Sequence, residues 1–259
     1  MSLLELASVD KIFGGLHAVR SVSLKIEAGS IFGLIGPNGA GKTTLFNLIT
    51  GVYTPEHGSI TFEGKPITGL SPAEIAARGV ARTFQNIRIF KSMTVAENVM
   101  VAGHHLHRAS VLDALLRNRR YEADEQALQG RARELLHILA LDGLDHEQAG
   151  SLPYGSQRRL EIARALMLSP KLLLLDEPAA GMNSQESQAL NEQIRFLQKE
   201  LGLTVVLVEH NMAVVMNVCE TIHVVDHGET IAEGTPAAIR ANPAVLAAYL
   251  GEEPEGAHP

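Results

Sequence analysis

The sequence predicts an α/β fold in which a parallel core carries an antiparallel sheet at its side and a helical lobe inserted within it. Two continuous apolar runs, Leu172–Leu175 and Thr204–Val208, are typical of parallel strands that are buried on both faces. Shorter runs separated by turns precede them, which favours an antiparallel sheet. Residues 92–168 instead carry apolar side chains at helical spacing. We therefore expect one domain over residues 1–259, with the core at 1–87 and 169–259 and the lobe at 88–168.

Composition narrows the class of protein. The 259 residues, of which 46% are hydrophobic, suffice for one large domain or for a core with a small second lobe. The net charge of −7 comes without a basic stripe, so we expect no nucleic-acid partner. The single cysteine, Cys219, allows no intrachain disulfide and indicates a reducing compartment. We find no signal peptide and no uncharged apolar run of about 18 residues. We therefore expect a soluble, cytoplasmic protein whose membrane role would come through a partner.

Four short runs near the N-terminus predict the antiparallel sheet. They are Leu4–Val9, Val19–Ile26, Ile31–Ile35 and Ser59–Phe62. Gly14-Gly15 provides a turn between the first two runs. A helix is expected after the last run, because Ser71-Pro72-Ala73-Glu74 forms a capping box with proline at the first helical position. Gly79 would end this helix, and a strand-like run, Val80–Gln85, follows it.

The segment Gly36–Thr44 fits the pattern G-x-x-x-x-G-K-[ST] of a phosphate-binding P-loop. The apolar run Ile31–Ile35 precedes it, and Leu45, Leu48, Ile49 and Val52 recur after it at helical spacing, with Gly51 as the helix end. This strand–helix context argues against a chance match. The helix N-terminus and the loop N–H groups would hold phosphates, Lys42 would reach the β- and γ-phosphates, and the Thr43 hydroxyl would hold Mg²⁺. The expected nucleoside triphosphate site comprises Gly36, Asn38, Gly39, Ala40, Gly41, Lys42, Thr43 and Thr44.

The later elements follow from the same kinds of signal. In the lobe, one apolar helical face is formed by Leu128, Ala132, Leu135, Leu136 and Leu139. Between the two buried strands, Leu190, Ile194, Leu197 and Leu201 indicate an amphipathic helix, which makes this segment a βαβ unit. Asn183 with Glu186 would cap its start and Gly202 would end it. A hairpin around His227-Gly228 and two short helices, starting at Thr235-Pro236 and Asn242-Pro243, complete the chain.

Polar side chains follow three of the predicted strands. Because strand C-termini of a parallel sheet face the ligand crevice, Asp176 is expected to hold Mg²⁺ in the second shell of Thr43. Glu177 would orient and activate the attacking water. His210 would donate to the γ-phosphate, although a lone histidine at a strand end is more often structural. Gln85 would touch both Mg²⁺ and water and so sense the γ-phosphate.

A second anion-binding helix start is expected around residues 151–168. A glycine-containing turn there precedes a helix beginning at Gln157-Arg158-Arg159, and basic residues in a first turn oppose the helix dipole. Broken local rules tend to mark functional sites. An ordinary exposed helix start is the alternative.

Together these segments resemble an ATP-binding cassette (ABC) ATPase. The matches occur in the family's order and span most of the chain: Gly36–Thr44 resembles Walker A, Gln85 the Q-loop, Leu152–Gln157 the signature motif, Leu172–Glu177 Walker B, Ala180–Asn183 the D-loop and His210 the switch histidine. The resemblance implies a RecA-like core and a head-to-tail dimer with two ATP molecules, in which Tyr154, Gly155 and Ser156 of one subunit face the P-loop of the other. It also implies that Phe13 stacks on adenine with Val19 nearby, whereas Phe13 taken alone would more often be a core aromatic.

Other segments are similar to one subgroup, the ATP-binding subunits of high-affinity branched-chain amino acid importers. They include Phe13-Gly14-Gly15, 82–85, 158–164, 176–181 and 242–251. Urea or short-amide importers are close relatives and lipopolysaccharide export is a more distant one. Two positions depart from the family pattern. Pro153 replaces a signature serine, so backbone donors at Gly155 and Ser156 and the Ser156 hydroxyl would make its contacts, and Asn183 replaces the D-loop aspartate.

The resemblance implies partners and a location. We expect a dimer with itself or with a paralogous ATPase, two membrane permeases that dock on the lobe, and, indirectly, an extracytoplasmic solute-binding protein. The chain would then lie at the cytoplasmic face of the inner membrane. A soluble ABC ATPase of the iron–sulfur assembly type is the alternative, whereas a kinase or GTPase lacks support because no N-K-x-D motif follows. No metal site is expected at His104, His105 and His107, whose spacing does not form one helical face.

Overall fold

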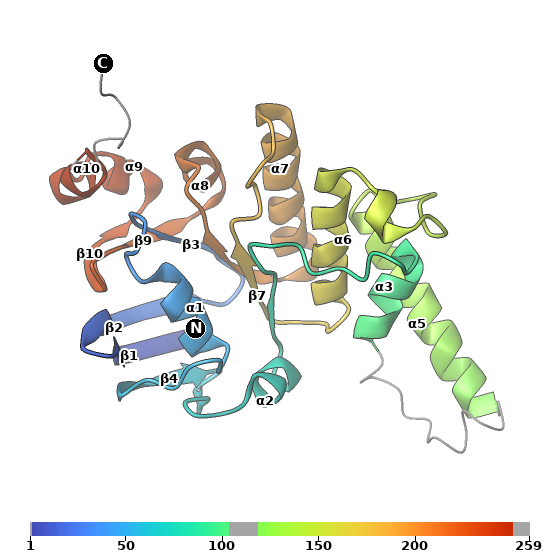
Figure 1. Ribbon diagram of the computed structural model, residues 1–259, viewed down its shortest axis with the longest axis horizontal. Coiled ribbons are helices and arrows are strands. Elements are labelled where there is room, and N and C mark those ends of the chain that lie inside the picture. Colours follow the sequence, from blue (N-terminus) through green and yellow to red (C-terminus); the bar gives the residue numbers. More distant parts are fainter. Residues whose placement is uncertain (1, 104–118, 251–259) are drawn as a thin grey trace. The chain divides into compact units, whose positions relative to one another are not determined.

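The computed structural model describes residues 2–103 and 119–250, which form two compact units (Figure 1). The first, here the core unit, contains the residues up to Arg82 and those from Lys171 onward. The second, here the helical unit, contains Thr83–Pro170. His104, His105 and His107 lie outside the described residues. Within the described residues, no cluster of three or more His, Cys, Asp or Glu side chains is arranged to hold a metal ion.

The expected antiparallel sheet is present in the core unit. Its strand order is β2-β1-β4-β5, with bounds Leu16–Glu27, Ser2–Phe13, His57–Phe62 and Lys65–Pro66. The turn between β1 and β2 is Gly14-Gly15, where both glycines have positive φ, as tight hairpin turns require. Both strands continue further than the apolar runs indicate, because the hairpin pairing extends to Phe13↔Leu16 beside the turn.

A six-stranded sheet forms the rest of the core unit. Its strand order is β10-β9-β3-β8-β7-β6, with bounds Glu229–Gly234, Thr221–Asp226, Ile31–Ile35, Thr204–Val208, Leu172–Asp176 and Val80–Arg82. β9, β3, β8, β7 and β6 run parallel, and β10 pairs antiparallel with β9. The run Ile31–Ile35 was expected among the antiparallel strands, and this expectation is wrong, because β3 pairs parallel with both β8 and β9. All residues of β3, β7 and β8 are buried, which confirms the interpretation of the continuous apolar runs. The strand expected at Val80–Gln85 is shorter than predicted, since β6 ends at Arg82.

Helix α1 (Lys42–Ile49) lies between the two sheets (Figure 1). Its buried residues Leu45, Phe46, Leu48 and Ile49 belong to one hydrophobic core with residues of both sheets. Val52 was expected on the same face, but the helix stops before it and the side chain is exposed. The reason is Gly51, whose positive φ ends the helix.

The other core-unit helices begin and end at the predicted signals. α2 (Pro72–Ala77) and α7 (Ser184–Leu201) each start with a complete capping box, at Ser71 and Asn183. Gly202 ends α7 in the left-handed conformation. Leu201, expected on the apolar face of α7, is partly exposed at its last turn. The remaining helices are α8 (Met212–Val218), α9 (Pro236–Arg240) and α10 (Pro243–Leu250).

The helical unit contains α3 (Val95–Ala102), α5 (Arg119–Ile138) and α6 (Tyr154–Leu166), with a 3₁₀ turn at Ala149–Ser151. α3 packs against both α5 and α6. The predicted apolar face, Leu128 to Leu139, is buried. In the parts of the chain that the structure describes, no helix combines the length and the apolar character needed to cross a membrane.

Candidate functional site

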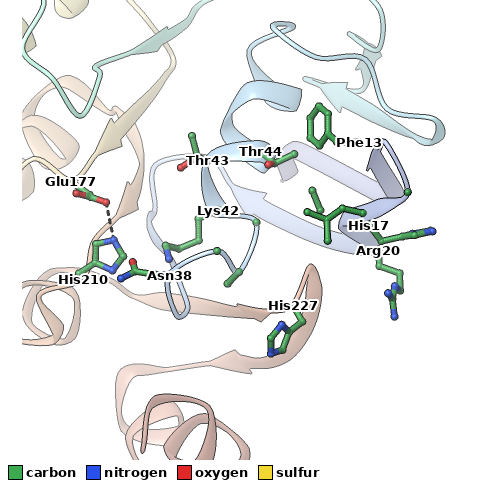
Figure 2. A pocket seen from close by; sticks show the side chains of 16 residues that line it. Phe13, His17, Arg20, Asn38, Lys42, Thr43, Thr44, Glu177, His210 and His227 are labelled. Atoms are coloured by element: carbon green, nitrogen blue, oxygen red, sulfur yellow. Dashed lines mark hydrogen bonds and ion pairs between the residues drawn. The ribbon is translucent and has the colours of Figure 1, made fainter. Parts of the chain in front are cut away.

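A cavity of about 630 Å³ opens above the P-loop of the core unit. Figure 2 shows Glu177 and His210 on one side of the loop and Phe13, His17 and Arg20 on the other. The volume of this cavity is typical of small-molecule sites. The lining residues come from the β1–β2 hairpin, the P-loop, α1 and the loops after β7, β8 and β9: Phe13, Gly15, Leu16, His17, Ala18, Arg20, Asn38, Gly39, Ala40, Gly41, Lys42, Thr43, Thr44, Glu177, His210 and His227.

The P-loop is fixed by backbone constraints that only glycine meets. Gly41, the residue before α1, has φ +103, and a Cβ there would lie 2.4 Å from the carbonyl oxygen of Ala18. Lys42 is nearly buried, and its Nζ donates to the carbonyl oxygens of Gly36 at 2.6 Å and Pro37 at 2.8 Å. The ammonium group therefore lies inside the loop, where a bound anion would be surrounded by cationic and N–H donors.

Two residues predicted for catalysis meet at the ends of neighbouring strands. Glu177 follows β7 and His210 follows β8. Glu177 Oε1 lies 2.7 Å from His210 Nε2, a contact marked by the dashed line in Figure 2. Glu177 has a positive φ of 48°, uncommon for a residue with a side chain, and its N–H donates to the carbonyl oxygen of Val208.

The side of the cavity formed by the first hairpin differs from the prediction. Phe13 is 40% exposed and lies edge-on to Tyr53, with Lys11 Nζ 5.1 Å from its ring centre. Val19 is fully buried in the core and does not line the cavity. His17, Ala18 and Arg20 from the same strand line it instead. Strand alternation places His17 on the face of Val19 and places Ala18 and Arg20 on the other face, so alternation alone does not indicate which of them meet a ligand.

Asp176, expected to hold Mg²⁺, is bound to an arginine that the sequence reasoning missed. Arg82 Nη2 lies 2.7 Å from Asp176 Oδ2, and both side chains are nearly buried. Arg82 also donates to Asn47 Oδ1 at 2.7 Å, so it joins β6 to β7 and α1. Asp176 itself is not among the residues that line the cavity. A charged residue directly after two apolar residues of a short strand was the available signal for Arg82.

The helix that contains the signature segment begins earlier than expected. α6 begins at Tyr154 after Pro153, three residues earlier than predicted. The N–H groups of Ser156 and Gln157 both donate to the Pro153 carbonyl oxygen, and the Ser156 hydroxyl accepts from Arg159. Of the donors expected at this helix start, the Ser156 N–H is therefore already used within the turn. Burial lowers the pKa of Arg159.

Arg158, which the alternative of an ordinary exposed helix start would leave at the surface, is buried. Its guanidinium donates to the carbonyl oxygens of Phe84 at 2.6 Å and Gln85 at 2.8 Å, and to Glu161 at 2.8 Å. Glu161 in turn accepts from the N–H groups of Phe84 and Arg88. The ion pair therefore anchors the backbone around Gln85 to α6 within the helical unit. Gln85, Tyr154, Gly155 and Ser156 all belong to this unit, which is described separately from the cavity.

We expect Arg158→Met to destabilise the helical unit by about 3–5 kcal/mol, because it leaves the buried Glu161 carboxylate without its cation. The matched control is Arg131→Met, which removes a pair of the same spacing and the same 2.8 Å distance on the exposed face of α5. Exposed pairs contribute less than about 1 kcal/mol. Urea unfolding of both variants checks this prediction, and equal losses would show that the burial of Arg158 carries no special weight.

Family models match two parts of the chain. The model described as "ABC transporter" matches residues 19–180, and the model described as "Branched-chain amino acid ATP-binding cassette transporter" matches residues 229–255. The first match contains the P-loop, the signature segment, Asp176 and Glu177. The second contains β10 and the two C-terminal helices.

Curated relatives and solved structures agree with these matches. The chain is 45% identical to the high-affinity branched-chain amino acid transport ATP-binding protein BraF of Pseudomonas aeruginosa, covering 96% of this chain and 98% of BraF. It is 45% identical to LivG of Escherichia coli, described in the same words, covering 93% and 94%. The ADP conformation of MJ1267, an ATP-binding cassette of an ABC transporter, is 34% identical with a TM-score of 0.84, covering 97% and 100%. The dimeric structure of MJ0796, a bacterial ABC transporter cassette, is 25% identical with a TM-score of 0.76, covering 90% and 98%.

Proposed function

The chain belongs to the ATP-binding proteins of ABC transporters, in the group of high-affinity branched-chain amino acid transport, and we propose that it is the ATP-hydrolysing motor of such an importer. The observation that carries this proposal is the 2.7 Å contact of Glu177 with His210 at the mouth of the P-loop cavity. This contact supports the proposal because a carboxylate base and a histidine would stand beside the γ-phosphate of an ATP molecule bound in the cavity.

We assign the phosphates of ATP to the P-loop. The N–H groups of Gly39, Gly41 and Thr43 would surround them. The Lys42 ammonium group would give up its hydrogen bonds to the loop carbonyl oxygens and bind the β- and γ-phosphates instead. Phe13 is exposed enough to stack on the adenine base, and the adjacent Lys11 is paired with Glu56 at 2.8 Å. Asn38, Ala40 and Thr44 complete the wall of the cavity.

The residues near the P-loop fit a magnesium ion. Thr43 lines the cavity and would offer its hydroxyl, and the Asp176 carboxylate, already paired with Arg82, is a hard oxygen ligand that would act through water. When bound, the ion would neutralise charge on the phosphates. Gln85 is the third candidate ligand, and Arg158 holds its backbone carbonyl within the helical unit.

Glu177 and His210 would share the hydrolytic step. Glu177 would accept a proton from the water that attacks the γ-phosphorus, while the P–O bond to ADP breaks and inorganic phosphate is released. His210, hydrogen-bonded to Glu177, would orient the carboxylate and donate to the γ-phosphate. Lys42 and the loop N–H groups would stabilise the charge that develops on the phosphate oxygens.

We further propose a head-to-tail dimer in which the signature segment of one chain completes the ATP site of another. The resemblance to a dimeric cassette supports this arrangement. Tyr154 and Gly155 would present the first-turn N–H groups that are not bonded to the Pro153 carbonyl. The second chain would be another copy or a paralogous ATPase. Dimer closure on ATP would drive a conformational change in two membrane permeases. These permeases would dock on the helical unit at the cytoplasmic face of the membrane.

We expect Pro153→Ser to leave ATP hydrolysis within twofold of the original rate. Pro153 is the residue before the first turn of α6, and serine is a favoured residue at that position, so the helix start should be retained or gain about 1 kcal/mol. Steady-state ATPase assays and thermal unfolding would check this expectation. A tenfold loss, equivalent to about 1.4 kcal/mol, would show that the proline itself is required.

Purification of the chain from its native membranes, followed by mass spectrometry of bound proteins, tests the proposed function. We expect two multi-span permeases and a second ABC ATPase. The associated solute-binding protein would then be tested for leucine, isoleucine, valine and urea, which separates a branched-chain amino acid importer from a urea importer. Recovery of soluble partners alone would overturn the importer and favour an ATPase of the iron–sulfur assembly type.

A further inference from the structure

A buried carboxylate, Glu209, lies behind the two catalytic candidates and has no place in the hydrolytic step described above. It is the last residue before His210, and only 3% of its surface is exposed. A buried carboxylate is costly unless hydrogen bonds satisfy it. The hydrogen-bond partners of Glu209 therefore indicate which segments the buried carboxylate stabilises.

Glu209 binds the backbone of both catalytic loops. Its Oε1 accepts from the N–H of Ala179, two residues after Glu177, at 2.7 Å. Its Oε2 accepts from the N–H groups of His210 at 3.2 Å and Asn211 at 3.3 Å. One oxygen thus holds the loop after β7, and the other holds the loop after β8.

A second hydrogen bond joins the same two loops, at the ends of the strands that precede them. The N–H of Glu177 donates to the carbonyl oxygen of Val208, the last residue of β8. The two loops are therefore joined both at the strand ends and at Glu209. Beyond these connections, Asn183 caps α7 and the Asn211 side chain caps α8. Each loop therefore ends at a capped helix start, which restricts how far the two loops can separate.

The chemistry of the side chain matters for this role. An ionised glutamate only accepts hydrogen bonds, so both oxygens match N–H donors. Glutamine has the same shape but replaces one oxygen with an NH₂ group, which would face a backbone donor in either orientation. Burial raises the pKa of Glu209, while the N–H groups of Ala179, Asn211 and His210 oppose that shift.

We propose that Glu209 is a positioning residue that sets the distance between Glu177 and His210 by tying the loop after β7 to the loop after β8. The inference rests on the proposed ATP hydrolysis, because its effect is exerted through these two side chains. Glu209 itself would touch neither ATP nor water. Since the D-loop begins at Ala180, the same connection would let contacts made by the D-loop with a second chain reach His210.

We expect Glu209→Gln to lower kcat for ATP at least tenfold while KM changes less than twofold, because the P-loop is left intact. In a His210→Ala background, the same substitution should lower the residual rate less than twofold, measured with enzyme in excess over radiolabelled ATP. A residue that supports only general stability would lower both rates equally. The matched control is Glu192→Gln, on the exposed face of α7, which should keep kcat within twofold.

Hydrogen exchange of the original protein gives a measurement that does not depend on any variant folding. The amides of Ala179, His210 and Asn211 should exchange slowly, and if Glu209→Gln folds, they should exchange faster in it. Fast exchange of Ala179 in the original protein, an unchanged kcat in Glu209→Gln, or additive losses with His210→Ala would overturn the inference. If Glu177→Gln or His210→Ala retains the original activity, the proposed function fails instead.

Discussion

Glu177→Gln is expected to abolish steady-state ATP hydrolysis while leaving ATP binding intact. Glutamine keeps the shape of the side chain and can still bond to His210, but it cannot accept a proton from water. Removing a positioned general base typically lowers the rate by about 10²–10⁴. The P-loop contacts that bind ATP are unaffected, so Kd for ATP should change less than twofold. ATPase assays and equilibrium titration with ATP check the two parts separately.

The same variant should accumulate as an ATP-bound dimer, because closure no longer leads to hydrolysis. Analytical ultracentrifugation with ATP and with ADP would show a dimer only with ATP. Glu186→Gln is a suitable control, since Glu186 lies exposed in the first turn of α7 in the same unit. Hydrolysis by Glu177→Gln at the original rate would remove Glu177 from the catalytic assignment.

Lys42→Ala is expected to weaken ATP binding by about 100–1,000-fold. The Lys42 ammonium is held in the loop by two carbonyl oxygens, at 2.6 and 2.8 Å, and it is the buried cation positioned to meet the phosphates. Hydrogen bonds that involve a charged group contribute about 1.5–3 kcal/mol each, so the loss of two contacts at the lower end of this scale, about 3–4 kcal/mol together, accounts for the expected factor. Calorimetric titration of ATP would measure the change directly.

The control for Lys42→Ala is Lys25→Ala. Lys25 forms an exposed ion pair with Glu5 on the antiparallel sheet, and 66% of its side chain is accessible. Its replacement by alanine should therefore leave the affinity for ATP unchanged. Lys42→Arg is expected to weaken binding too, because the planar guanidinium does not fit the position of a compact ammonium. If Lys42→Ala binds ATP as the original protein does, the phosphates lie elsewhere.

Much of the fold could be predicted because its signals are local. The buried strands β7 and β8 appear as continuous apolar runs, and the capping boxes at Ser71 and Asn183 lie within four residues. The P-loop is similarly contained in nine consecutive residues. Each of these patterns dictates backbone geometry through contacts between near neighbours in the chain, so no tertiary information was needed.

The pairings that complete the site were decided by the tertiary structure. Residue types and strand ends indicated Asp176, Glu177 and His210 individually. The partner of Asp176, however, is Arg82, separated from it by 94 positions in the chain, and Arg158 bonds to Phe84 from 74 positions away. Only the parallel order of β6, β7 and β8 brings the first pair together, and only the packing inside the helical unit brings the second.

By itself, therefore, the sequence determined the class of the fold, the P-loop and the chemical types of the catalytic residues. The tertiary structure decided which residues of β2 line the cavity, which arginine meets Asp176, and that Glu209 is buried between two loops. The physical reason is that a polar group leaves water only where partners satisfy it. Those partners come from distant segments, which a pattern of neighbouring residues does not encode.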